Sequence, residues 1–321
     1  GKQAGDINVK FLKGTTNITK DNTTIKSTGY ETHVKDTSMH HFLHPAFQFN
    51  GEELGFWMAK FEPSNFNGIP KIVPNITSWR NINISSAYQT SFEMRTNNIF
   101  YGWLESEIDS HMMTNLEWGA TAYLSASQYG ADEEVWKNNS SSYITGCAGD
   151  SVSASSKSGC QNEYHTVNGQ MATTTYNIYG VYDMSGGASE RTMANYNNII
   201  SDSDFAINEF QKVYPQYLSR YYTPESDFYH GVGMDYDDNV YGDAIYETSN
   251  NAAKYDGFEY LGITSGSWYS DYSSLPYLAR PWFVRGGAWG NGALAGVFDF
   301  HRGSGNVSAA DTFRPVLTPL K

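Results

Sequence analysis

Hydrophobic and aromatic residues are unevenly distributed along this chain. Residues 1–28 are rich in Thr, Asn and Lys and contain few large apolar side chains, so they predict a linker or a weak edge segment. From residues 44–49 onward the chain is aromatic and interrupted by glycines almost to its end. The short apolar run at residues 55–61 is typical of a buried strand. We therefore expect one folded domain over residues 29–321.

Two segments show the periodicity of a helix. Residues 77–88 begin with Thr and Ser, which are good helix N-caps, and predict one helix. Residues 109–125 predict a second helix more strongly, because their apolar side chains recur at helical spacing. Those side chains belong to Met113, Leu116, Ala120, Tyr123 and Leu124.

Long polar segments separate the apolar ones. Residues 129–177 are rich in Ser, Asn and Gly, and residues 201–274 are dense in Tyr and Asp. Residues 282–317 return to short aromatic segments between glycines, which predict short strands and turns. Few helices, many turns and a continuous aromatic character indicate a single, loop-rich α+β domain with large insertions.

Composition limits the partners that this protein is expected to bind. The chain has 321 residues, a formal net charge of −13 and a sequence pI near 5.0. Nucleic acid and anionic membrane surfaces both attract basic faces, so neither is an expected partner. No apolar run approaches the roughly 20 residues that cross a bilayer. The sequence opens without a signal peptide, which says nothing about the native N-terminus.

The two cysteines of the chain, Cys147 and Cys160, flank a Ser- and Gly-rich stretch. The simplest interpretation is a disulfide that closes this loop and contributes on the order of 3 kcal/mol. A disulfide implies an oxidising, extracytoplasmic compartment. Two free thiols in a mobile loop are the alternative.

Candidate metal ligands are weak. His40 and His44 have the spacing of two ligands on one helical face, but Pro45 disfavours a helix there, so surface or strand-pairing histidines are favoured. The loop over residues 235–243 alternates oxygen-bearing side chains suited to structural Ca²⁺, although a solvated acidic turn is the default interpretation. We expect no cofactor and leave Ca²⁺ open, with Asp235, Asp237 and Asn239 as its candidate ligands.

Four sequence blocks follow one another along the chain. They are VPNITSW at residues 73–79, MTNLEW at 113–118, NIYGVYDMSGGASE at 177–190, and VRGGAW at 284–289 followed by TFRPV at 312–316. Together they resemble the formylglycine-generating-enzyme-like (sulfatase-modifying) family, a branch of the C-type lectin fold. The resemblance covers roughly residues 56–317 and implies a single C-type-lectin-like domain.

The residues of these blocks are mainly scaffold residues. Gly286 and Gly287 allow close backbone approach at a point where Arg285 would pair with a buried carboxylate, either Glu190 or Glu117. Motifs of this kind argue for a fold and not for an activity. Three tryptophans are expected to fill the core, namely Trp79, Trp118 and Trp289.

The catalytic groups that the resemblance would imply have no counterpart here. Oxidase members of the family bind copper through a pair of C-terminal cysteines, and no Cys follows Arg285. A related iron motif, His-x3-His-x-Glu, would begin at His40 and His44, but Ala46 stands where the Glu belongs. The chain also lacks G-x-S-x-G, a phosphate loop and a dinucleotide fingerprint. We therefore expect no enzyme activity, with a copper-dependent oxidoreductase of the formylglycine-generating type as the alternative.

The C-terminal block resembles the variable region of proteins diversified by diversity-generating retroelements. Randomised Asn codons in that family cannot produce Lys, Glu, Gln, Met or Trp. Residues 285–320 contain no Lys, Glu, Gln or Met, and their single Trp belongs to the scaffold. The resemblance implies a variable region at residues 285–317, although solvated loops of a non-diversified relative are the alternative. The expected ligand-binding positions are Ala288, Gly290, Leu294, Asp299, His301, Arg302, Ser304, Asn306, Ser308, Ala309 and Asp311.

The favoured hypothesis is a ligand- or receptor-binding protein displayed outside the cell, on a bacterial surface or a phage particle. Its partner would be a protein or a glycan, because variation between fixed apolar anchors suits a binding face. A purely structural surface or phage tail subunit is the second alternative. Aromatic residues of the long insertion would extend the face, because Tyr gives a large contact area at low entropic cost. They are Tyr236, Tyr241, Trp268 and Tyr269.

Overall fold

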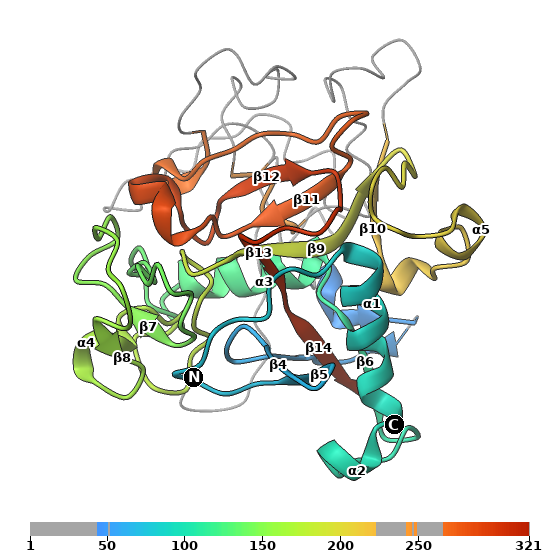
Figure 1. Cartoon of the computed structure of the whole chain (residues 1–321), viewed down its shortest axis with the longest axis horizontal. Helices are drawn as coiled ribbons and strands as arrows, with labels where there is room; N and C mark the ends of the chain where they lie inside the picture. The colour runs from blue at the N-terminus through green and yellow to red at the C-terminus, as the bar shows by residue number, and fades with distance from the viewer. Residues whose placement is uncertain (1–43, 51, 223–241, 246, 249–265, 321) are drawn as a thin grey trace, which may run out of the picture.

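The computed structural model describes residues 44–50, 52–222, 242–245, 247–248 and 266–320 (Figure 1). Over these residues the chain is a mixed α+β structure with few helices and several small sheets, joined by long irregular segments. The predicted α+β, loop-rich class is therefore confirmed at this level. The expected linker at residues 1–28 lies outside the described residues.

A five-stranded sheet lies at the centre of the described structure. Strand β9 (Ser189–Tyr196) pairs antiparallel with β11 (Trp282–Arg285), and β12 (Phe300–Gly303) pairs with the other edge of β11. Different halves of β9 pair in parallel with β10 (Ser219–Tyr221) and β13 (Asp311–Phe313). Every residue of β9 is buried, the pattern of a strand covered on both faces. The predicted C-terminal strands are confirmed.

A second, three-stranded sheet follows directly from the first. Strand β14 (Pro315–Pro319) begins one residue after β13 and leads away from the central sheet (Figure 1). It pairs antiparallel with β6 (Ile108–Met112) along its full length, and its other edge pairs with β3 (Trp57–Met58). Helix α1 (Ile84–Glu93) packs against β6. The C-terminal stretch therefore joins both sheets into one structure.

Helix α1 begins at Ile84 rather than at the predicted residue 77. Asn83 is its N-cap, and the Asn83 side-chain oxygen accepts a hydrogen bond from the Ser86 N–H at 2.7 Å. The residues before it are not helical: Ile82 forms an antiparallel bridge with Ser308, and Asn81 has a left-handed φ of 59°. Pairing with a distant segment therefore outweighs local helix propensity in this part of the chain.

Helix α3 (Asn115–Ser125) accounts for only the second part of the predicted helix over residues 109–125. Thr114 and Glu117 form a capping box, in which the Glu117 carboxylate accepts a hydrogen bond from the Thr114 N–H at 2.8 Å. Residues 109–112 belong instead to β6, because β14 takes up their backbone donors and acceptors. The prediction of a helix is wrong for those four residues and for Met113 and Thr114, which precede the helix.

The remaining described elements are short. The predicted strand over residues 55–61 reduces to β3, and its Trp57 is 61% exposed, so a fully buried strand is the wrong description. Residues 129–177 are mostly irregular, as predicted, and contain the Cys147–Cys160 disulfide, which confirms that prediction. The short elements are η2 (Pro45–Phe47), β1 (Gln48–Phe49), β2 (Glu52–Glu53), β4 (Ser64–Phe66), β5 (Ile69–Lys71), η3 (Met94–Thr96), α2 (Asn98–Tyr101), β7 (Cys147–Ala148), β8 (Asn162–Glu163), α4 (Val167–Gln170), α5 (Ile207–Phe210), η4 (Pro215–Tyr217), η6 (Trp268–Ser270) and η7 (Trp289–Leu294).

The core consists of buried apolar clusters on both sides of the central sheet. Trp118 is fully buried in one of them, where its indole N–H donates to the Val297 carbonyl at 2.7 Å. Trp79 is half-buried, with its ring edge-on to Phe313. Trp289 is half-buried at the surface in η7. The expectation of a core position is therefore right for Trp118, right in part for Trp79 and wrong for Trp289.

Two buried arginines tie the central sheet to its surroundings. Arg314 pairs with Glu190, and both side chains are fully buried. Arg285 is also fully buried, but it donates to three backbone carbonyls instead of a carboxylate. The expected pairing of Arg285 is wrong, because Arg314 takes Glu190 and His111 takes the other candidate, Glu117, at 2.7 Å.

Candidate binding face

The predicted variable region leaves the core at the end of β11. Gly286 and Gly287 have φ angles of 81° and 66°, in the left-handed region that glycine adopts without strain. A Cβ atom on Gly287 would lie 2.9 Å from the Ala295 Cα, so the turn also has no room for a side chain. These two glycines let the chain pass from the buried Arg285 to η7 at the surface.

The expected ligand-binding positions differ in exposure. Asp299 and Arg302 are buried. Three positions are exposed, namely Gly290, Asn306 and Ala309. The others are half-buried, and they are Ala288, Leu294, His301, Ser304, Ser308 and Asp311.

The structure places Asp299 and Arg302 inside the protein. Arg302 Nη1 donates to the Leu275 carbonyl at 2.9 Å, and its guanidinium lies 4.7 Å from the centroid of the Tyr277 ring. Side chains alternate along β12, so Arg302 shares the buried side with Phe300. This burial contradicts the expectation that the two residues face a ligand, and we leave them out of the candidate face.

Asp299 forms an ion pair with the half-buried His301. The distance from His301 Nδ1 to Asp299 Oδ1 is 2.9 Å. Burial lowers the pKa of His301, but the charge and hydrogen bond of Asp299 outweigh burial and raise that pKa above its ordinary value. The pair therefore favours a protonated imidazole at the edge of the face.

Residues 304–310 form a loop between β12 and β13, and buried groups from other parts of the protein hold its backbone. The Ile84 N–H donates to the Gly305 carbonyl at 3.1 Å, and Arg191 Nη1 donates to the same carbonyl at 3.0 Å. Arg191 also pairs with Asp311 at 3.0 Å. The side chain of Asn306 nevertheless stays exposed. The loop thus presents its side chains on a backbone held by buried groups.

The side chains of Arg80 and Tyr143 connect this loop to Trp289 of η7. The Trp289 ring packs edge-on against Tyr143, with centroids 6.1 Å apart. The Arg80 guanidinium stacks on the Tyr143 ring, 3.7 Å from its centroid. Arg80 Nη1 donates to the Ala309 carbonyl. We define the candidate face as η7 and residues 304–309, joined by Arg80 and Tyr143. Sequence reasoning did not find Arg80 or Tyr143, and no local pattern marks either of them.

Aromatic residues of the long insertion contribute less than expected. Trp268 is buried, with its ring 4.9 Å from that of Phe298. Tyr269 is half-buried against the same ring. Tyr236 and Tyr241 lie outside the described residues. Trp268 is therefore a core residue, and it cannot contact a ligand in this conformation.

The structure describes only one of the residues considered as metal ligands, His44. Asp235, Asp237 and Asn239 lie outside the described residues, as does His40. His44 is fully buried, its Nε2 lies 2.9 Å from the Gly242 carbonyl oxygen, and burial lowers its pKa to about 4. Within the described ranges, no group of three His, Cys, Asp or Glu side chains is arranged to hold a metal ion.

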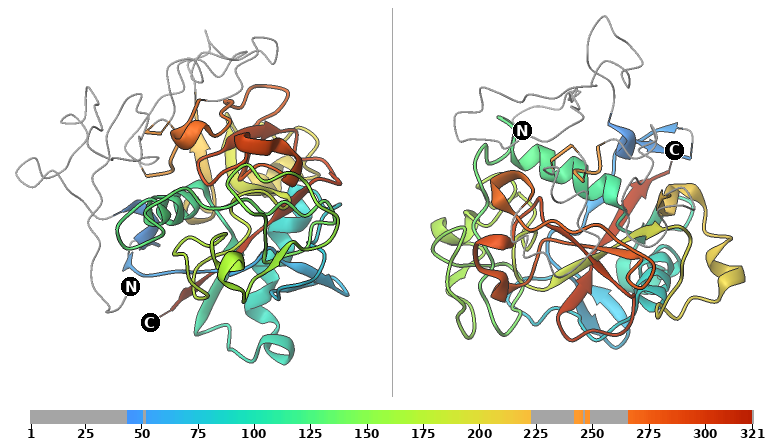
Figure 2. Two further views of the ribbon diagram at one scale, coloured as in Figure 1. Left: turned by 90° about the vertical axis from the view of Figure 1, so that its left-hand side faces the viewer. Right: turned by 90° about the horizontal axis from the view of Figure 1, so that it is seen from above.

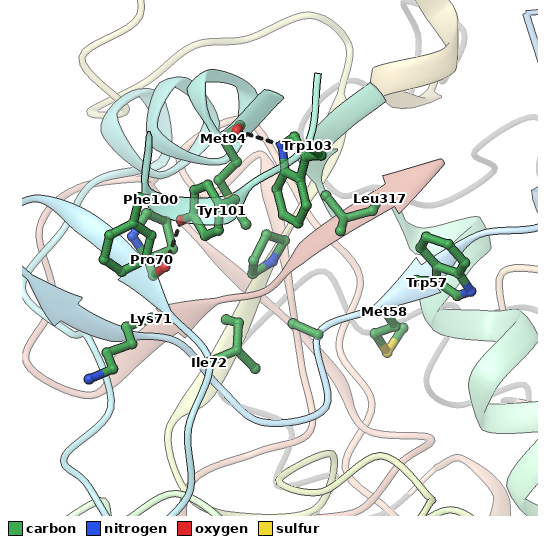
Figure 3. Close-up of a pocket in the computed structure, with 12 residues that line it drawn as sticks. Trp57, Met58, Pro70, Lys71, Ile72, Met94, Phe100, Tyr101, Trp103 and Leu317 are labelled. Atoms are coloured by element: carbon green, nitrogen blue, oxygen red, sulfur yellow. Dashed lines mark hydrogen bonds between the residues drawn. The ribbon is translucent and has the colours of Figure 1, made fainter. Parts of the chain in front are cut away.

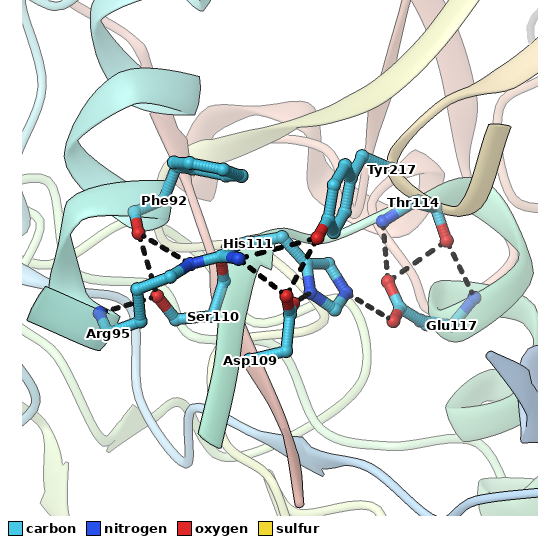
Figure 4. A network of polar contacts seen from close by, with 8 residues as sticks. All are labelled: Phe92, Arg95, Asp109, Ser110, His111, Thr114, Glu117 and Tyr217. Carbon is cyan, nitrogen blue, oxygen red and sulfur yellow. Dashed lines mark hydrogen bonds and ion pairs between the residues drawn. The ribbon is translucent and has the colours of Figure 1, made fainter. Parts of the chain in front are cut away.

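A buried polar network is centred on Asp109 and His111 of β6, in the three-stranded sheet (Figure 4). His111 contacts Asp109 Oδ1 through Nδ1 at 2.8 Å and Glu117 Oε1 through Nε2 at 2.7 Å. Arg95 pairs with Asp109 at 2.7 Å, and the Tyr217 hydroxyl donates to the same carboxylate at 2.7 Å. His111 is fully buried, so its imidazole does not reach solvent. It joins β6 to the start of α3.

Comparison with known proteins does not identify a relative. No protein-family model matches the chain, and no curated protein is similar to it. The family resemblance of the sequence blocks therefore stays a prediction. No helix in the described part of the chain is long and apolar enough to span a bilayer.

Proposed function

We propose that this protein is a ligand- or receptor-binding protein of a bacterial cell surface or a phage particle, without catalytic activity. Its binding face is the candidate face formed by η7 and residues 304–309, and its partner is a protein or a glycan. One observation carries the proposal: buried groups hold the backbone of the face, Arg191 at Gly305 and Lys137 at Gly292, while the side chains of Asn306 and Ala309 stay exposed.

Substitutions in the candidate face and substitutions in the buried groups that hold its backbone should differ in their effect on the folding free energy. Asn306 and Ala309 are exposed, so replacing either should change the folding free energy by about 0.5 kcal/mol or less. Arg191 is buried and donates to Ile82, Gly305 and Asp311, and each buried acceptor left unpaired would cost about 1–3 kcal/mol. Such a division permits sequence change at the surface while the frame is retained, as a diversified binding face requires.

Arg80, Tyr143 and Trp289 add contacts of the kind that dominate protein interfaces. Tyr and Trp offer large, rigid surfaces, and Arg is enriched among residues that carry binding energy. No carboxylate among the described residues forms an ion pair with Arg80. Its positive charge, in a chain of net charge −13, favours an anionic group of the partner at this point.

The state of the cysteines argues against the copper oxidoreductase. The chain has two cysteines, and both are joined in the Cys147–Cys160 disulfide. That mechanism needs thiols to hold copper and attack a substrate. A structural surface subunit is distinguished from a binding protein by the experiments below.

Sequencing this locus from many isolates tests the proposal. We expect substitutions to concentrate at the exposed and half-buried positions of the face and to avoid Asp299 and Arg302. A reverse transcriptase gene and a near-copy of the C-terminal coding segment should lie nearby. Identical C-terminal segments across isolates would refute diversification and favour a structural subunit.

A display experiment tests binding directly. One library randomises Gly290, Asn306 and Ala309 in the full chain, and a matched library randomises three exposed residues elsewhere, Val167, Tyr179 and Ile207. Both are selected against the same panel of purified proteins and immobilised glycans. We expect binders from the first library only. Equal enrichment from the two libraries would contradict the assignment of the face.

A further inference from the structure

A cavity of about 380 Å³ lies between β14, β5 and the segment that contains α2 (Figure 3). Tyr101 and Trp103 form one wall, with ring planes 1° apart and centroids separated by 4.6 Å. Ile72, Met58 and Leu317 complete the apolar lining. The volume corresponds to roughly a dozen water molecules, enough for one aromatic or branched aliphatic group.

Two polar groups of the lining already have hydrogen-bond partners within the protein. The Tyr101 hydroxyl donates to the Pro70 carbonyl at 2.6 Å, and the Trp103 indole N–H donates to the Met94 carbonyl at 3.0 Å. Burial also raises the pKa of Tyr101, so its phenol stays neutral. An occupant would therefore gain from apolar contact and not from hydrogen bonds with these groups.

Exposed apolar side chains line the cavity or neighbour its lining residues. Trp57 is 61% exposed and Phe100 is 37% exposed, and both line it. Phe66 packs against Phe100 with ring centroids 5.7 Å apart. Ile99, in α2, is fully exposed, and Leu104 follows close behind it. We name these five residues the α2 patch. Large exposed apolar groups gathered in one place are typical of an interaction surface.

Charges next to the α2 patch are mostly acidic. Glu93 and Glu105 are exposed and adjoin the cavity residue Met94 and the patch residue Leu104 in sequence, and the exposed Glu107 accepts a hydrogen bond from the Leu104 N–H at 3.0 Å. Lys71 is the only ionisable amine in the lining; it points away from the cavity, and its ammonium lies over the ring of the patch residue Phe66 at 5.3 Å, which places one positive charge beside the three carboxylates (Figure 3). The surroundings therefore favour a partner that carries positive charge.

We propose that the α2 patch and its cavity dock a partner protein through one aromatic or branched apolar anchor side chain flanked by basic residues. A second copy of this chain fits poorly, because its net charge is also −13. Helix α2, which carries part of the patch, lies at the opposite end of the described structure from β12 (Figures 1 and 2). Docking there leaves the candidate face open, so this proposal and the proposed function can fail separately.

Short peptides of defined sequence serve as probes. Acetyl-Lys-Trp-Lys-amide is titrated into the full chain by calorimetry, beside acetyl-Lys-Ala-Lys-amide and acetyl-Glu-Trp-Glu-amide. We expect saturable binding of the first peptide. The alanine peptide, which lacks the Trp anchor, should bind about tenfold more weakly than the first peptide, because truncating an anchor removes most of the interface energy. Acidic flanks should weaken it by about threefold or more, through unfavourable charge at the rim.

Matched variants locate the binding. Trp57→Ala should weaken the Lys-Trp-Lys peptide by about fivefold, whereas Tyr214→Ala, at a residue 66% exposed in another part of the structure, should leave it unchanged. Glu105→Gln should reduce the preference for basic flanks, and Glu209→Gln, in α5, should not. If Trp57→Ala fails to fold by circular dichroism, Phe100→Ala takes its place.

Several results would overturn the proposal. They are no saturable binding up to about 10 mM peptide, equal binding of the alanine peptide, and equal binding of the acidic peptide. Sedimentation velocity could give a further result that contradicts the proposal. A dimer of the unmodified chain that Trp57→Ala converts to monomer would show that a second copy covers the patch.

Discussion

Raising the pH should destabilise this protein through His111. The imidazole is fully buried between the carboxylates of Asp109 and Glu117. Burial alone lowers the pKa of His111, but the two carboxylates outweigh burial and raise the pKa from 6.5 to about 9. The native state therefore holds a proton that the unfolded chain releases at a lower pH.

The sign and size of the effect follow from this difference. The folded pKa is raised, so the stabilisation is fully present below pH 6.5 and is lost as the pH rises through 9. A shift from 6.5 to 9 is about 2.5 units, and at 1.36 kcal/mol per unit it corresponds to about 3 kcal/mol. His111→Gln removes the titrating group, so the variant should lack this loss.

Urea unfolding at about pH 6 and about pH 9.5 measures the difference. Unmodified protein should lose about 3 kcal/mol more than His111→Gln between the two values, because other titrating groups cancel in the comparison. His165→Gln, at a side chain 54% exposed, is the matched control and should behave like the unmodified protein. Parallel losses in the unmodified protein and His111→Gln would refute the reasoning.

Three further predictions concern the frame. Replacing Cys147 and Cys160 together by Ser should lower the free energy of unfolding by about 3 kcal/mol, and dithiothreitol should then cause no further loss. Arg302→Ala should cost about 1–3 kcal/mol in urea unfolding, because it empties a buried position, whereas Asn306→Ala should cost about 0.5 kcal/mol or less. Gly287→Ala should lower the melting temperature, because its φ is 66° and a Cβ would contact the returning chain. Equal costs at the buried and exposed positions, or an unchanged melting temperature, would contradict the assigned frame.

Local signals identified part of this structure correctly. The spacing of Cys147 and Cys160 indicated the disulfide, because a short flexible loop keeps the two sulfurs near each other in the chain. Strong periodicity indicated α3, although its first predicted residues form β6. A run of apolar residues cannot tell a strand from a helix until its pairing partner is known, and that partner, β14, lies about 200 residues away in the sequence.

The sequence by itself determined what depends on neighbours along the chain: the acidic charge, the disulfide, the capping box of α3 and the short C-terminal strands. The tertiary structure alone decided burial and long-range pairing. It buried Arg302, paired Glu190 with Arg314, and brought Arg80 and Tyr143 beside the C-terminal segment. The physical reason is that a polar side chain has the same chemistry at the surface and in the core. Only the distant segments folded around it decide whether it meets solvent or a partner inside the protein.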